Sequence, residues 1–101
     1  MKLIVTTVKT ISQARKLLDP LFAKHWIACA KFHPITSRYR WNGTLHQESE
    51  MFIEMETSRV CAKVAVAWIL EHHPYEKPVI RVSQVRANPE AETWVKSETH
   101  L

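Results

Sequence analysis

Residues 27–57 read IACAKFHPITSRYRWNGTLHQESEMFIEMET, and the architecture of the chain follows from them. Asn42 and Gly43 form the strongest short-range hairpin signal, because both central positions of a type I′ turn need a positive φ. The flanking residues 27–41 and 44–57 are rich in β-formers. In the second run, apolar residues alternate with mostly acidic ones. We therefore predict a two-stranded antiparallel ribbon that turns at Asn42 and Gly43.

Both strands of this ribbon are long for so small a domain, since strands usually have about 5–6 residues. A two-residue turn places Tyr39 opposite His46 and Trp41 opposite Thr44 on one face. Pro34 interrupts the first strand, which predicts a bulge or a bend there. A long ribbon that projects from a small domain needs a surface to lie on, and we expect another subunit to provide it.

The residues on either side of the ribbon complete a βαββαβ order followed by a C-terminal helix. They combine β-branched runs, helical spacing of apolar residues, capping residues and prolines. The predicted elements are a strand at 3–8, a helix at 11–25 kinked near Pro20, the ribbon, a helix from Ser58 to Pro74, a strand at 79–85 and a helix from Asn88. This order is the ferredoxin-like split βαβ plan, an α+β fold whose antiparallel sheet carries helices on one face.

Composition narrows the class of protein. The chain has 101 residues, 46% hydrophobic and 24% charged, which is typical of a single domain over residues 1–101. The only glycine is Gly43, so glycine-cradled phosphate sites are excluded, because their backbone needs several glycines. No run approaches the roughly 20 apolar residues of a membrane span, so we expect no membrane partner. The net charge of +4 permits an anionic partner without demanding one.

Cysteine and tryptophan usage bear on the compartment and the assembly. Cys29 and Cys61 lie far apart without a CxxC pair, so neither a zinc knuckle nor a disulfide framework is indicated. The N-terminal residues are too few and too polar for a signal peptide, and we expect a cytoplasmic protein. A chain this short buries only about two-thirds of its unfolded surface. Its four tryptophans exceed what such a core can enclose, which favours an oligomer.

Metal-binding chemistry is richest in residues 72–78, which read HHPYEKP. Imidazole is a good ligand for Cu(II), Zn(II) and Ni(II), and Glu76 could complete or orient a site. Alternatively, His72 and His73 only cap the carbonyls at the end of the second helix, which Pro74 ends. Neighbouring helical residues point about 100° apart, so both rings reach one metal ion only where the helix has frayed. Spacing alone favours the cap.

Other candidate sites are weaker. A free cysteine is usually a small buried hydrophobe, so Cys29 needs ligand partners from elsewhere to hold a metal, and Cys61 belongs to a helical core stripe. No nucleophile stands in a base-activated arrangement, which argues against an enzyme. Glu48 and Glu50 could form a carboxylate pair, but solvation or interface salt bridges explain them better.

Nucleic-acid binding is also disfavoured. Residues 38–41 interleave cations with aromatic rings, as single-strand stacking platforms do. The opposite strand, however, carries Glu50, Glu54 and Glu56, which repel phosphate, and the usual RNA-binding strand motif is missing. We expect Arg38 and Arg40 to pair with carboxylates across an interface, and we expect no nucleic acid partner.

Several motifs together resemble the CutA family, small proteins associated with divalent-ion tolerance. The matching pieces occur in family order and spacing over nearly the whole chain. They are residues 5–7, 27–30, 37–43, the Glu-bearing strand to Thr57, residues 73–78, and Asn88 with Trp94. The S-x-Y-x-W-x-G and H-P-Y-E-x-P pieces are fairly specific when they occur together.

The resemblance implies a ferredoxin-like subunit in a homotrimer, similar in architecture to the PII signalling proteins, whose hairpin arms extend their sheets across subunit boundaries. It also implies binding of divalent cations, copper above all, and a role in metal tolerance, with no metal required for folding. His72 and His73 then become the leading candidate ligands, with Cys29 and Glu76 behind them. The alternative function is a PII-like sensor or scaffold that holds a small ligand or partner in clefts between subunits.

This chain departs from the family pattern at several positions. Thr6 stands where some copper-binding members carry a cysteine, so a soft thiolate ligand is missing there. Lys31 stands where asparagine is usual, and Ala87 and Ala91 replace a glycine and a tyrosine. We therefore expect the fold to be inherited more securely than the family site.

Overall fold

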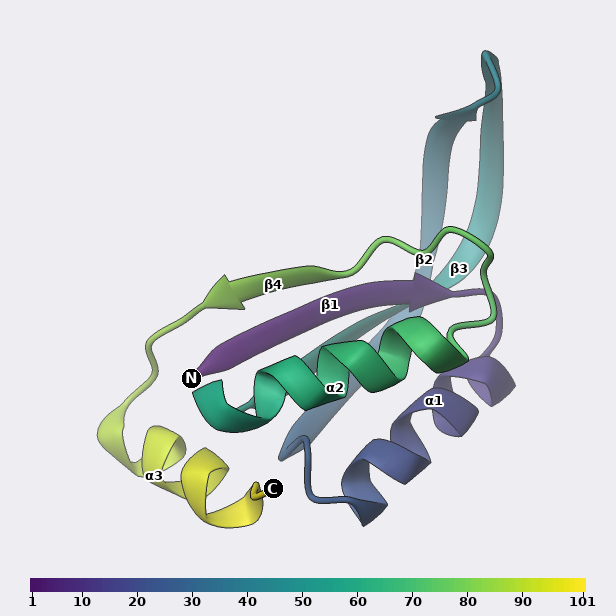
Figure 1. The fold of residues 1–101 in the computed structure, drawn as a ribbon. Coiled ribbons are helices and arrows are strands. Elements are labelled where there is room, and N and C mark those ends of the chain that lie inside the picture. The colour runs from purple at the N-terminus through teal and green to yellow at the C-terminus, as the bar shows by residue number, and fades with distance from the viewer.

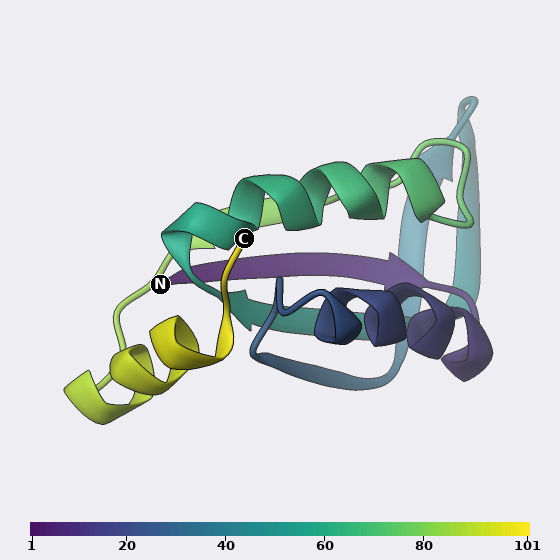
Figure 2. The same ribbon diagram turned by 60° about the horizontal axis from the view of Figure 1, so that its bottom comes forward.

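In a computed structural model, residues 1–101 form four strands and three helices (Figure 1). The elements are β1 (Lys2–Val8), α1 (Ile11–Ala23), β2 (Cys29–Trp41), β3 (Thr44–Thr57), α2 (Arg59–His72), β4 (Arg81–Gln84) and α3 (Pro89–Glu98). The sheet order is β2-β3-β1-β4, and every neighbouring pair is antiparallel. Helices α1 and α2 cover one face of the sheet, whereas α3 lies beyond its end (Figure 2). The predicted ferredoxin-like fold is confirmed.

The hairpin of β2 and β3 has the predicted turn and register. Tyr39 pairs with His46 and Trp41 pairs with Thr44. Asn42 has φ 50° and Gly43 has φ 76°, so both central residues lie in the left-handed region that a type I′ turn requires.

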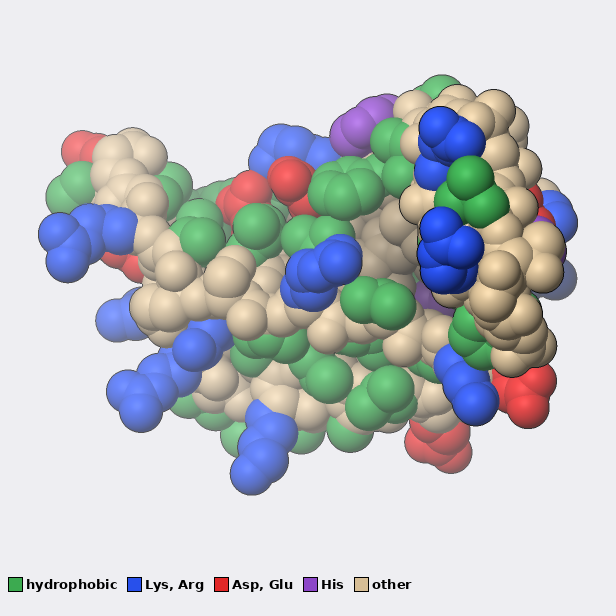
Figure 3. All heavy atoms as spheres, turned by 90° about the horizontal axis from the view of Figure 1, so that it is seen from above, with side chains coloured by type: hydrophobic (Ala, Val, Ile, Leu, Met, Phe, Trp, Pro, Cys, Tyr) green, Lys and Arg blue, Asp and Glu red, His purple; other side chains and the backbone are tan.

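The outer half of this hairpin, residues 35–50, stands clear of the rest of the sheet and is here called the arm. The last residue of β1, Val8, pairs with Met51, so the arm strands pair only with each other. Figure 1 shows the arm rising steeply from the sheet. The basic residues of the arm are Arg38 and Arg40. Figure 3 looks down on the molecule from the side of the arm tip and shows basic side chains beside apolar ones there. The exposed apolar side chains of the arm are Tyr39, Trp41 and Leu45.

The core lies between the sheet and the two covering helices. Alternate residues of β1 and β3 are buried, as expected for strands with one covered face. The core cluster comprises Ile4, Val8, Ala14, Leu17, Leu18, Leu21, Ile27, Ile53, Met55, Ala65 and Ile69. Trp26 and Trp68 only pack against its edge, while Trp41 and Trp94 are exposed, so no tryptophan is enclosed by a single chain.

Capping residues set the starts of the first two helices. Thr10 and Gln13 form a capping box at the start of α1, and the Ser58 hydroxyl accepts the Cys61 N–H at the start of α2. The predicted end of α1 at residue 25 is wrong, because His25 adopts φ 59°, a conformation that ends the helix. None of the three helices is long and apolar enough to cross a membrane.

Two predicted strands prove shorter. The sheet pairing of β2 begins at Cys29 rather than at Ile27, whose side chain is buried in the core. The last strand was expected over 79–85, but β4 covers only Arg81–Gln84, which pair with the first half of β1.

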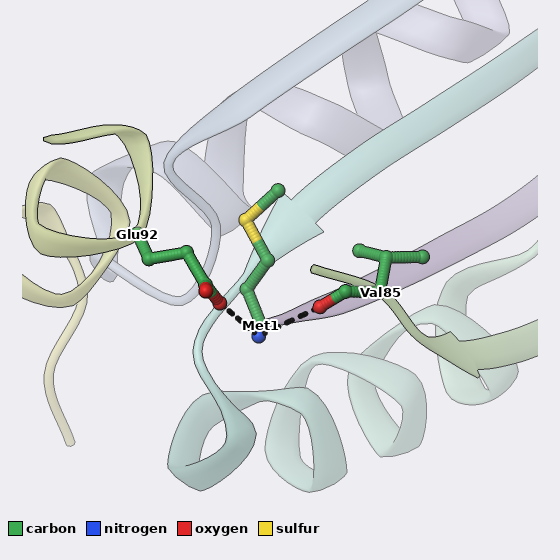
Figure 4. A network of polar contacts seen from close by, with 3 residues as sticks. All are labelled: Met1, Val85 and Glu92. Carbon is green, nitrogen blue, oxygen red and sulfur yellow. Dashed lines mark hydrogen bonds and ion pairs between the residues drawn. The ribbon is translucent and has the colours of Figure 1, made fainter. Parts of the chain in front are cut away.

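Helix α3 is tied to the start of β1. The Met1 ammonium donates to Glu92 Oε1 at 2.8 Å and to the Val85 carbonyl at 3.2 Å (Figure 4). The hydrogen bond and charge of this ammonium hold the pKa of Glu92 below its usual range. Val95 is fully buried, and the Thr99 hydroxyl after the last turn lies 2.9 Å from the Ser58 hydroxyl, so apolar burial and polar contacts together dock the helix.

The sheet face opposite the helices has no covering layer within the chain. Because Ile4 and Val8 point toward the helices, Leu3 and Val5 point the other way, together with Phe52 of β3. All three of these outward side chains are half-buried. A single chain therefore leaves apolar side chains accessible both on this face and on the arm.

Candidate metal centre

The histidine-rich segment begins at the end of α2. His72 is the last helical residue, and His73 has an extended backbone with φ −64° and ψ 135°. A residue before proline is pushed out of the helical region, so Pro74 ends the helix as predicted. The two imidazoles consequently leave the helix end in different directions.

The His73 ring points inward to β1, and both of its nitrogens are engaged. The Thr6 hydroxyl donates its single proton to the Val79 carbonyl at 2.8 Å. His73 Nε2 lies 3.0 Å from that hydroxyl oxygen, so Nε2 carries a proton and donates it. His73 Nδ1 accepts the backbone N–H of Tyr75 at 3.1 Å. The ring is thus neutral and fully hydrogen-bonded, and burial lowers its pKa.

Tyr75 extends this network to the base of the arm. Its hydroxyl donates to Glu50 Oε2 at 2.6 Å. Burial raises the pKa of Tyr75, and the hydrogen bond to the Glu50 carboxylate raises it further. Burial would also raise the pKa of Glu50, but hydrogen bonds from Ser37, Tyr75 and Thr7 outweigh it and hold that pKa below its usual range. Glu50 therefore clamps the loop after α2 to the sheet.

This clamp was not predicted. Glu50 was expected to be explained by solvation or an interface salt bridge, and that expectation is wrong, because the carboxylate is buried and hydrogen-bonded within the chain. Nothing in the local sequence distinguishes it from Glu48, Glu54 or Glu56. Only the return of the chain at Tyr75 gives Glu50 its donor.

His72 differs from His73, because only one of its two ring nitrogens makes a hydrogen bond within the chain. Its Nδ1 lies 2.9 Å from the Trp68 carbonyl, which can only accept, so Nδ1 carries the proton. The ring stacks on the Trp68 indole with centroids 3.9 Å apart and planes 13° apart. Its Nε2 makes no hydrogen bond within the chain, and the side chain is exposed. The ring borders a groove between α1 and α2 that is lined by Gln13, Lys16, Leu17, Pro20, Trp68, His72 and Pro74.

The two weaker candidates lie apart from these rings or on the open loop. Glu76 is exposed on the loop after α2. Cys29 pairs with Glu56, which pairs with Leu3, whereas the His73 ring contacts Thr6. Thr6 lies three residues beyond Leu3 on β1, which is about 10 Å along the strand. Cys29 is therefore separated from the histidines by two strands across the sheet and by about 10 Å along it.

The side chain of Lys31 lies beside Cys29. Its ammonium lies 3.7 Å from Cys29 Sγ and 2.7 Å from Glu56 Oε1. The hydrogen bond to Glu56 raises the pKa of Lys31 and keeps the ammonium charged. A charged ammonium beside the sulfur repels a metal cation. No three His, Cys, Asp or Glu side chains of the chain stand together as a ready-made metal site.

Fold and site together define a small ferredoxin-like protein with a projecting hairpin arm and a histidine-bearing loop after its second helix. The family model described as CutA1 divalent ion tolerance protein matches residues 2–98. The chain belongs to this family.

Individual relatives agree. The divalent-cation tolerance protein CutA of Yersinia pestis is 29% identical over 84 residues, which cover 82% of this chain and 71% of that protein. A CutA1 structure from Pyrococcus horikoshii superposes with a TM-score of 0.94 at 26% identity, covering all of both chains. The PII-like protein CutA from Nostoc superposes with a TM-score of 0.92 at 31% identity, covering 100% of this chain and 99% of that one.

Proposed function

We propose that this protein binds divalent cations, Cu(II) in preference to others, and acts in metal tolerance, with His72 as its primary ligand. Family membership supports the role in divalent-ion tolerance. The observation that carries the ligand assignment is the free Nε2 of His72, beside an Nδ1–H that donates to the Trp68 carbonyl. A metal-binding imidazole usually donates its other N–H to such a group, which fixes the tautomer and the ring direction.

The remaining candidates follow in an order set by their contacts. Glu76 is exposed on the same loop and is free to turn toward an ion near His72. His73 would bind a metal only after losing its hydrogen bond to Thr6 or to Tyr75. Cys29 is the weakest candidate, because the Lys31 ammonium faces its sulfur.

Single-histidine variants test this order. His72→Gln should weaken Cu(II) binding about tenfold or more, because it removes the only unoccupied imidazole nitrogen of the segment. His73→Gln is the matched control and should leave the affinity within about twofold of the original. Isothermal titration calorimetry of the purified chain measures both. Equal affinities in the original protein and in His72→Gln would refute the assignment.

We also propose a homotrimer. Half-buried Leu3, Val5 and Phe52 line an uncovered sheet face, and the arm exposes Tyr39, Trp41 and Leu45. Packing against further copies would cover both surfaces. Light scattering coupled to size exclusion should give about three times the 11.8 kDa mass of one chain. A mass equal to that of one chain at micromolar concentration would contradict the proposal.

The protein is proposed to act in the cytoplasm as a binding protein rather than an enzyme. Both cysteines are free thiols, which is the usual state in a reducing compartment. The polar side chains around His73 are committed to structural hydrogen bonds, which supports a binding role over catalysis by these groups.

A further inference from the structure

The groove between α1 and α2 has a volume of about 330 Å³ and opens on the outside of the helical layer (Figure 2). This volume lies at the lower end of the range of about 300–1,000 Å³ that is usual for small-molecule sites. Of the residues that line the groove, the proposed metal site uses only His72. The chemistry of the other lining residues points to a different kind of ligand.

Two polar side chains of α1 bring hydrogen-bond donors to this groove that have no acceptor within the chain. The Lys16 ammonium takes part in neither of the two ion pairs of the chain. The Gln13 Oε1 accepts the backbone N–H groups of Lys9 and Thr10 at 2.8 and 3.3 Å, which leaves both hydrogens of its Nε2 for another acceptor. No acidic side chain lines the groove. An unpaired ammonium beside a free amide donor suits a carboxylate, which accepts hydrogen bonds and carries the opposite charge.

The rest of the groove is largely apolar and rich in rings. The Trp68 indole stacks on the His72 imidazole and also packs against the edge of the core, so both of these contacts hold it in place. Leu17, Pro20 and Pro74 complete the apolar lining. Because the indole is already fixed, a flat apolar ligand can pack here with little loss of side-chain freedom. An apolar lining with a few polar groups is the usual composition of a small-molecule site.

We propose that the groove between α1 and α2 binds a small aromatic carboxylate. The Lys16 ammonium and the Gln13 amide hold the carboxylate, and the aromatic ring of the ligand lies against Leu17, Pro20 and Trp68. Copies that associate through the opposite sheet face leave the helical layer outermost, so the groove stays open in the proposed trimer (Figure 2). The site needs no metal ion and lies within one chain, so it is independent of the proposed metal site and of clefts between subunits.

Cinnamate is the probe, titrated into the metal-free full chain with EDTA present and followed by proton–nitrogen correlation NMR. The indole N–H resonance of Trp68 and the backbone amides of Gln13 and Lys16 should shift, with a Kd of about 1 mM or below for a ligand of this size. Cinnamamide has the same ring without the charge and should bind about fivefold more weakly, because hydrogen bonds to a charged group are stronger. Acetate, which has no ring, should leave these resonances unmoved at the same concentration.

Variants of two neighbouring cations separate a specific site from general attraction to a basic surface. Lys16→Gln should weaken cinnamate binding about fivefold and leave cinnamamide binding within about twofold. The matched control is Arg15→Gln, which removes an exposed cation of α1 that does not line the groove and should leave both affinities within about twofold. Circular dichroism of each variant confirms that its fold is intact.

Several results would overturn the proposal. Equal affinities for cinnamate and cinnamamide would show that the carboxylate is not recognised. Equal losses in Lys16→Gln and Arg15→Gln would indicate general electrostatic attraction. Shifts confined to residues outside the groove would place the ligand elsewhere. Shifts that appear only after copper is added would mean that the carboxylate coordinates the ion, which contradicts this site and leaves the proposed metal function standing.

Discussion

Glu50→Ala should lower the free energy of unfolding by about 3 kcal/mol. Hydrogen bonds to a buried charged group contribute about 1.5–3 kcal/mol, and removal of the carboxylate leaves a buried donor without an acceptor. The Tyr75 hydroxyl would lose its 2.6 Å acceptor. Urea unfolding followed by tryptophan fluorescence, at one fixed protein concentration, measures the loss. Tyr75→Phe removes a single hydrogen bond and should cost about 1–2 kcal/mol.

The loss should also depend on pH. The folded pKa of Glu50 lies below the ordinary value of 4.5, so the carboxylate contributes stability above about pH 4.5 and loses it as pH falls through the folded pKa. Glu50→Gln keeps the shape of the side chain and removes the charge. The difference between the original protein and this variant should stay constant from about pH 7 to 5 and shrink at lower pH. A difference that is unchanged at pH 3 would show that charge plays no part in the clamp.

Ile53→Ala should be the most destabilising single change, at about 4 kcal/mol, because truncation of a buried isoleucine costs about 2–5 kcal/mol. Ile53 is fully buried in β3, between its sheet partners Thr6 of β1 and Phe32 of β2. Both helices cover this face of the sheet, so the cavity cannot easily collapse. Urea unfolding at fixed concentration again gives the measurement.

The matched control is Ile11→Ala, at the start of α1. The same atoms are removed, but Ile11 is 47% exposed, so the change should stay within about 0.5 kcal/mol. Equal costs at the two positions would mean that the core does not lie where the structure places it. Similar Cu(II) affinity in both variants, measured under conditions where both are folded, would separate stability from metal binding.

Most of the fold could be predicted because its signals are local. The type I′ turn depends on Asn42 and Gly43 alone, and it sets the pairing of Tyr39 with His46. Pro74 ends α2 by constraining the residue before it. The predicted bounds were less accurate where the signal was not local. The length of β4, for example, depends on how far this strand can pair with β1.

The candidate site was predictable in composition but not in arrangement. The residues 72–78 stand out in the sequence by their ligand types, yet their spacing could not say where each ring points. The His73 ring points inward because it hydrogen-bonds to Thr6, which lies 67 residues earlier in the chain. The Glu50 carboxylate is held by the Tyr75 hydroxyl, 25 residues later. Thr6 was noted only as the place of a missing thiolate, and its partnership with His73 has no local signal.

Local chemistry therefore decides the order of elements, the hairpin register and the presence of two adjacent histidines, because turns, caps and prolines act within a few residues. Tertiary structure alone decides that both ring nitrogens of His73 are hydrogen-bonded, whereas one ring nitrogen of His72 stays free. The reason is that a proton on one ring nitrogen is assigned by whichever donor or acceptor the fold brings to the other. The same pair of residues thus becomes one structural histidine and one vacant ligand.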